Sequence, residues 1–158
     1  MAHLHYALDL CIEAFIVNDN AVLLRLHDKY NIWTGPGGHI DPGEDPNEAV
    51  KREAMEEAGL DITLIGPTDW NREDTETNKD LVPPMFLNRH HINEHHDHSC
   101  LVFAATSPTR EIKPHEDEDE NCEFRWVTAQ ELEEMHQTDD RLRDEVYRYA
   151  MKAFELAG

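Results

Sequence analysis

The chain has 158 residues, with 34 acidic against 14 basic side chains and a formal net charge of −20 at pH 7. This length can bury one substantial core, so we expect a single domain over residues 1–158. The excess of carboxylates argues against binding to a DNA or RNA duplex, which depends on clustered lysine and arginine contacts to phosphates. A small nucleotide is not excluded, because a bound metal ion can neutralise its charge.

The cysteines and the N-terminal residues indicate the cellular compartment to expect for this protein. Cys11, Cys100 and Cys122 are an odd number of cysteines without a C-x-x-C pair, and we expect all three to lie in apolar, strand-like runs. Buried free thiols in a reducing cytoplasm are the expected state. The first residues lack the pattern of a signal peptide and no stretch reaches transmembrane length, so we expect no membrane association.

Alternating side chains predict a strand over residues 8–17 and a second strand over 21–26. Apolar residues occupy alternate positions of the first strand, and Asp9 and Glu13 lie on its other face. Residues 18–20 (Asn-Asp-Asn) favour a turn, so the two strands should form an antiparallel hairpin. Trp33 follows the hairpin; it can fill the core or stack on a nucleobase, and we favour the core.

Residues 37–60 begin as a tight glycine turn, continue as a polar loop and then form a helix. Asp45 suits the N-cap, Pro46 suits the first helical position, and Glu48 completes a capping box. Gly59 is expected to end the helix in the left-handed conformation.

One face of this predicted helix carries three glutamates. At about 100° per residue, Glu53, Glu56 and Glu57 fall within an arc of roughly 100°, with the small Ala49 near its middle. Repulsion between such close carboxylates is usually relieved by a divalent cation, and hard oxygen ligands suit Mg²⁺ or Mn²⁺. The alternative is a solvated acidic face, since like-charge pairs on a helix cost only about 0.3 kcal/mol each.

The whole stretch resembles the Nudix box. Gly38, Glu44 and the run Arg52-Glu53-Ala54-Met55-Glu56-Glu57-Ala58-Gly59-Leu60 stand at the box spacing within 23 residues, and Trp33-Thr34-Gly35-Pro36-Gly37-Gly38-His39 is similar to the usual lead-in. The resemblance to Nudix hydrolases implies an α/β fold, an α/β/α sandwich in which a mixed β-sheet lies between the Nudix loop-helix and the C-terminal helices. A doubly wound parallel sheet fits less well, because the N-terminal hairpin is antiparallel.

The resemblance also implies a metal-dependent hydrolase acting on a nucleoside diphosphate linked to another moiety, X. Water would attack phosphorus in the diphosphate linkage, with Mg²⁺ as the expected cofactor and Mn²⁺ as the alternative. Glu56 and Glu57 are the expected metal ligands, together with a backbone carbonyl near Gly37 or Gly38. Glu53 is either the general base or a further ligand.

Five residues receive further expected roles. Arg52 can hold Glu53 or Glu44 in place by bidentate pairing, so that Glu44 anchors the loop to the helix. Arg25, Gly37 and His39 are expected to bind the substrate, which is a small nucleotide or another diphosphate.

After the box we expect a short strand at 61–65, a loop at 69–79, an edge strand at 85–92 and a central strand at 99–105. Five histidines lie within residues 90–98, namely His90, His91, His95, His96 and His98. They can bind a transition metal, but we favour a solvated loop whose histidines have unrelated roles. His96 or His98 can project into the substrate cleft.

The most acidic stretch, residues 115–123, is expected to be a loop before a strand at 124–127. In Nudix proteins a glutamate shortly before this strand often supplies a further metal ligand or the base; Glu120 is our first choice by position and Glu118 the second. Thr128 begins a second capping box and a helix to about His136. The last helix is expected to start at Asp139 or Asp140 and to pack on the body through apolar residues at helical spacing.

Two other functions fit the same fold. A catalytically silent Nudix module could bind a nucleotide as a sensor, although such modules often lose box glutamates that this chain keeps. An isoprenoid diphosphate isomerase would need a cysteine in the cleft, and none of the three is obviously placed there. A monomer and a homodimer are both compatible with the sequence.

Overall fold

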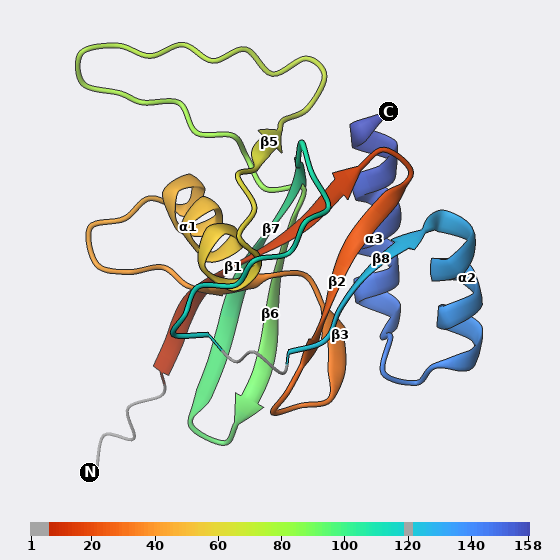
Figure 1. The fold of residues 1–158 in the computed structure, drawn as a ribbon. Coiled ribbons are helices and arrows are strands. Elements are labelled where there is room, and N and C mark those ends of the chain that lie inside the picture. Colours follow the sequence, from red (N-terminus) through yellow and green to blue (C-terminus); the bar gives the residue numbers. More distant parts are fainter. Residues whose placement is uncertain (1–6, 119–121) are drawn as a thin grey trace, which may run out of the picture.

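The computed structural model describes residues 7–118 and 122–158, and Figure 1 shows their arrangement. Within these residues eight strands form one sheet, accompanied by three helices. The strands are β1 (Ala7–Asn18), β2 (Ala21–His27), β3 (Ile32–Thr34), β4 (Gly37–His39), β5 (Thr63–Ile65), β6 (Phe86–Asn93), β7 (His96–Thr106) and β8 (Phe124–Thr128). The helices are α1 (Pro46–Ala58), α2 (Ala129–Thr138) and α3 (Asp144–Ala157).

The sheet is mixed, as predicted. Its main path runs β3-β2-β1-β7-β5, while β4 pairs with β1, β6 with β7 and β8 with β2. The long central pair β1–β7 is parallel, and the other described pairs are antiparallel. The β1–β2 hairpin predicted from the alternation of apolar residues is confirmed.

Helices cover both faces of the sheet (Figure 1). On one face, Ile12 of β1 belongs to the same buried cluster as Val50 and Ala54 of α1. On the other face, Phe15 of β1 packs edge-on against Tyr149 of α3, with ring centroids 5.9 Å apart. The central strand is therefore buried from both sides, which confirms the α/β/α sandwich.

The ends of α1 follow the local signals in the sequence. The Asp45 side chain accepts a hydrogen bond from the Glu48 N–H at 2.9 Å, and the Glu48 side chain accepts one from the Asp45 N–H at 2.9 Å. Gly59 adopts the left-handed conformation with φ of 68°, and its N–H bonds to the Met55 carbonyl at 2.9 Å. Both caps are confirmed.

The prediction of a tight glycine turn at residue 37 is wrong. Gly37 and Gly38 belong to the short strand β4, which pairs antiparallel with β1. A β-carbon on Gly37 would lie 2.2 Å from the backbone oxygen of Ile12, and one on Gly35 would lie 2.2 Å from that of Ala14. These glycines are needed for close approach to β1 and not for a turn.

The prediction of a solvated loop for the histidine-rich stretch is also wrong. Residues 90–98 form the closed end of a hairpin between β6 and β7, with the turn at Glu94 and His95. Strand β7 begins at His96 because it continues to pair with the start of β1, where Ala7 lies opposite His96. The edge position predicted for β6 is confirmed, since among the described strands it pairs with β7 alone.

The last helix begins later than predicted. It starts at Asp144, while Asp139 is the C-cap of α2. The Asp139 carboxylate accepts hydrogen bonds from Arg141 Nη2 at 2.8 Å and from Trp33 Nε1 at 3.1 Å. Trp33 is fully buried, which confirms its place in the core. In the part of the chain that the structure describes, no helix is long and apolar enough to cross a bilayer.

Candidate active site

Helix α1 places its glutamates against strand β4. Glu57 is buried, and its Oε2 accepts a hydrogen bond from the Gly37 N–H at 2.9 Å. Glu53, one turn earlier, lies so close to Gly38 that a β-carbon on residue 38 would be 2.4 Å from Glu53 Oε1. The carboxylates of Glu53 and Glu57 therefore lie directly against the two glycines of β4.

Arg52 connects the carboxylates to one another. Its Nε and Nη2 donate to the two oxygens of Glu44 at 2.7 and 3.1 Å. Its Nη1 donates to Glu53 at 2.9 Å and to Glu56 at 3.0 Å, and Nη2 also donates to the His39 carbonyl at 3.0 Å. The sequence left open whether Arg52 pairs with Glu53 or Glu44, and the structure places it against both. Because one planar guanidinium donates to all three carboxylates, it restricts the orientation of each.

The two buried carboxylates, Glu53 and Glu57, are harder to ionise than exposed ones. Burial raises the pKa of Glu57 to about 7, although the charge of Arg25 and the Gly37 hydrogen bond act in the opposite direction. Burial also raises the pKa of Glu53, against the hydrogen bond from Arg52. The charge of Glu118 raises the pKa of both glutamates, which places this residue near the site. Glu120, the first choice for a further ligand, lies outside the described residues.

This set of oxygens suits a hard divalent cation. Glu53, Glu56 and Glu57 supply carboxylates from one helix face, and a doubly charged ion would lower the electrostatic cost of ionising the two buried ones. The donor set therefore fits the Mg²⁺ or Mn²⁺ expected from the sequence.

Two of the three predicted substrate-binding residues lie beside these glutamates. Arg25 of β2 is mostly buried, and its Nη2 lies 3.6 Å from Glu57 Oε1. Gly37 donates its N–H to the same carboxylate. The His39 side chain instead points to Asp9, with Nε2 3.9 Å from Oδ2, and only the His39 backbone carbonyl faces Arg52.

Cys122 is a residue near the site that the sequence did not reveal. It lies in irregular chain before β8 and is partly exposed, so its expected burial within a strand is wrong. Its thiol donates to the Leu26 carbonyl at 3.6 Å, and the charges of Arg25 and Glu57 both act on its pKa. Burial raises that pKa, which favours the unreactive thiol over the thiolate. No spacing motif surrounds Cys122, so its position depends on folding alone.

A comparison with protein families agrees with this geometry. Residues 9–149 match the family model of the NUDIX domain. The chain therefore belongs to the Nudix family, and its class is that of the Nudix pyrophosphohydrolases.

Individual relatives support this assignment. The nucleoside triphosphatase NudI of Escherichia coli K12 is 30% identical over 122 residues, which cover 74% of this chain and 79% of NudI. The structure of a NUDIX-family hydrolase from Clostridium perfringens has a TM-score of 0.80 and 29% identity, covering 95% of this chain and 98% of that one. The Ap4A hydrolase of Caenorhabditis elegans, at 20% identity and a TM-score of 0.60 over 94% of this chain and 97% of its own, shares the fold.

Proposed function

We propose that this enzyme hydrolyses the diphosphate linkage of a nucleoside diphosphate joined to a moiety X, with Mg²⁺ or Mn²⁺ held by its box glutamates. The observation that carries the proposal is the meeting of two α1 carboxylates, Glu53 and Glu57, with the Gly37–Gly38 backbone and Arg25. Arg52 holds the third carboxylate, Glu56, beside Glu53. Nucleoside triphosphates are the proposed substrates, with phosphate as X, since the relative NudI is a nucleoside triphosphatase.

The metal ligands are Glu56, Glu57 and the backbone carbonyl of Gly38, with Glu53 as a further ligand or as the base. When bound, the ion supplies positive charge to the phosphate oxygens and makes a coordinated water easier to deprotonate. As the base, Glu53 accepts a proton from the attacking water, and burial raises its pKa above that of an exposed glutamate, which makes it a stronger proton acceptor. The further ligand proposed at Glu120 awaits its own test by substitution.

The other residues position the reactants. Arg52 orients Glu53 and Glu56 through its shared guanidinium, and Glu44 holds Arg52 through two hydrogen bonds. Arg25 supplies positive charge to the substrate phosphates. The backbone of Gly37 faces Glu57 of α1, and that of His39 faces Arg52. A diphosphate would be repelled by the carboxylates alone, so Arg25 and the ion act together.

The remaining expectations fit this proposal. We treat residues 1–158 as one domain, since all described strands share a sheet. The three free cysteines suit a reducing cytoplasm. The silent sensor module is disfavoured, because all the box glutamates are present, and Glu53 and Glu57 meet the glycines of β4.

The test is a substrate panel assayed with Mg²⁺ or Mn²⁺, with and without EDTA. It comprises deoxynucleoside triphosphates, their oxidised forms, ADP-ribose, NADH, dinucleoside polyphosphates and sugar nucleotides, with products separated by anion exchange. Isopentenyl diphosphate is assayed separately for isomerisation. Metal-dependent release of pyrophosphate and a nucleoside monophosphate would support the proposal. Binding of a nucleotide without turnover would support the sensor, and isomerisation of isopentenyl diphosphate that Cys122→Ser abolishes would support the isomerase.

A further inference from the structure

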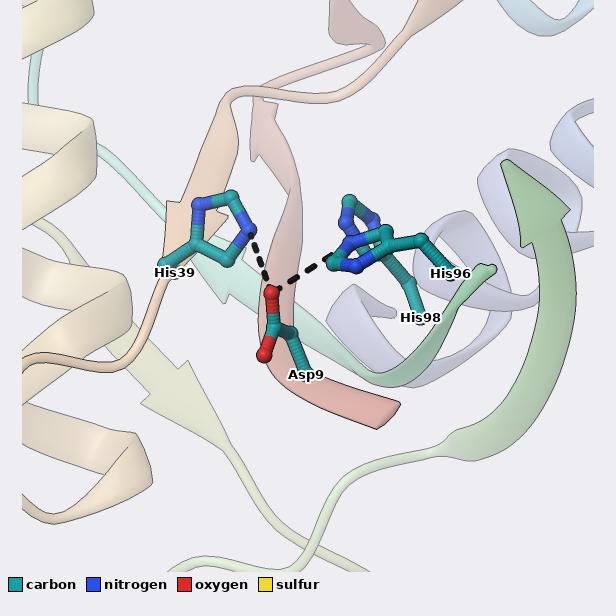
Figure 2. Close-up of side chains that lie close together, drawn as sticks. All are labelled: Asp9, His39, His96 and His98. Carbon is teal, nitrogen blue, oxygen red and sulfur yellow. Dashed lines mark ion pairs between the residues drawn. The ribbon is translucent and has the colours of Figure 1, made fainter. Parts of the chain in front are cut away.

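Four metal-ligating side chains gather on the other side of β4 from Arg52. They are Asp9 of β1, His39 of β4, and His96 and His98 of β7 (Figure 2). The Nε2 atoms of His96 and His39 lie 3.3 and 3.9 Å from Asp9 Oδ2. The His98 ring lies 4.8 Å from that of His96 and 5.0 Å from that of His39, centroid to centroid. One ligand atom from each of the four residues lies within 4.8 Å of all the others.

The strand register explains why these residues meet. In the parallel pair β1–β7, Asp9 lies opposite His98, and in the antiparallel pair β1–β4, Cys11 lies opposite His39. Residues two apart on a strand project to the same face, so His96 joins His98 on that face. Three adjacent strands therefore hold the four side chains, and no flexible loop is needed to bring them together.

This cluster is distinct from the carboxylate site. Asp9 and Cys11 share one face of β1, and Cys11 belongs to the buried cluster that packs against α3. Ile12 projects to the opposite face, toward α1 and its glutamates. The two sites are nevertheless neighbours in the chain, because His39 directly follows Gly38.

We propose that Asp9, His39, His96 and His98 form a binding site for a divalent transition-metal ion, with Zn²⁺ as the best-fitting ion. Three imidazoles and a carboxylate suit zinc, whereas Mg²⁺ prefers oxygen ligands alone. Bonds of about 2.0 Å in a tetrahedron separate the ligand atoms by about 3.3 Å. The Asp9–His96 distance of 3.3 Å already has that value, and side-chain rotation closes the rest.

The surroundings hold the cluster in place and leave it open to solvent. His90 lies against the His98 ring at 5.3 Å, and its Nδ1 pairs with Asn88 Oδ1 at 2.9 Å. His39 is exposed, which gives an ion a path from solvent.

The test is metal binding by the full chain without a histidine tag. We compare wild type with His98→Ala and with Asp9→Asn, which retains the shape of the side chain. The control is His95→Ala, which removes an exposed histidine at the turn of the same hairpin. Zn²⁺ affinity from isothermal titration calorimetry should fall by about tenfold or more in His98→Ala and Asp9→Asn, and stay unchanged in His95→Ala.

The absorption spectrum of bound Co²⁺ distinguishes binding at this site from binding at the glutamates of α1. Tetrahedral Co²⁺ with nitrogen ligands absorbs visible light strongly, whereas six-coordinate Co²⁺ among oxygens absorbs weakly. We expect the strong bands in wild type and in Glu57→Gln, and their loss in Asp9→Asn. Absence of the bands from wild type, or equal Zn²⁺ affinity in wild type, His98→Ala and Asp9→Asn, would overturn the proposal.

Discussion

Gly38 and Glu53 approach so closely that a β-carbon on residue 38 would lie 2.4 Å from Glu53 Oε1. The obstructing atom is the end of a flexible side chain, so the glutamate would move while the backbone keeps its place. Gly38→Ala should therefore lower kcat/KM by about 100-fold through displacement of Glu53. The free energy of unfolding should change by less than about 1 kcal/mol, as measured by urea denaturation.

Gly37→Ala is the matched comparison. A β-carbon there would meet the backbone oxygen of Ile12 at 2.2 Å, and a paired strand cannot move aside as a side chain does. We expect a loss of stability of about 3 kcal/mol. Equal stability in the two variants would contradict the distinction between a site contact and a sheet contact.

Substitution of Trp33 tests whether its indole fills the core or stacks on a nucleobase of the substrate. Its indole is fully buried and donates to Asp139 Oδ2 at 3.1 Å. Trp33→Phe should lower the free energy of unfolding by about 2 kcal/mol, because it removes a hydrogen bond to a charged acceptor. KM should stay within about twofold, because Trp33 belongs to the core cluster that packs against α3 and not to the cluster under α1. Trp70→Phe is the control in a loop, and a raised KM with unchanged stability in Trp33→Phe would instead indicate base stacking.

Local signals made the box helix predictable, and long-range pairing made its surroundings hard to predict. Asp45, Glu48 and Gly59 act within a few residues of one another, so their sequence spacing sufficed. Strand β4 depends on β1, some 26 positions away, and its glycines have little strand preference of their own.

Dependence on contacts remote in sequence also explains the other differences between the predictions and the structure. The histidine hairpin depends on β7 extending along β1, which no local pattern reveals. Asp139 is the C-cap of α2 and accepts a hydrogen bond from Trp33, a partner remote in sequence, whereas α3 starts at Asp144. The glutamates of the site were predictable since one helix carries them, whereas Cys122 reaches Arg25 only through the fold.

The buried carboxyl of Glu13 makes the free energy of unfolding depend on pH. Its Oε1 accepts a hydrogen bond from the Gly35 N–H at 2.8 Å, and burial raises its pKa from 4.5 to about 7. Between these values the folded chain binds more protons than the unfolded chain, so this carboxyl lowers stability as pH rises from 4.5 toward 7. The full cost, about 3 kcal/mol, is present above pH 7.

Glu13→Gln should remove this cost. Relative to wild type, its free energy of unfolding should rise by about 3 kcal/mol between pH 5 and pH 8 in urea denaturation. Glu76→Gln makes the same charge change on an exposed loop and serves as the control. An identical difference between Glu13→Gln and wild type at both pH values would show that the carboxyl does not titrate in this range.

Hydrolysis by Glu57→Gln with and without Mg²⁺ tests the central claim most directly. The substrate is the nucleoside triphosphate turned over fastest by wild type, and Glu155→Gln on the exposed side of α3 is the control. We expect Glu57→Gln to keep the wild-type circular dichroism spectrum and lose about 100-fold or more in Mg²⁺-dependent kcat/KM, while EDTA abolishes wild-type turnover. Near wild-type turnover by Glu57→Gln would contradict the account, and so would wild-type turnover that survives EDTA.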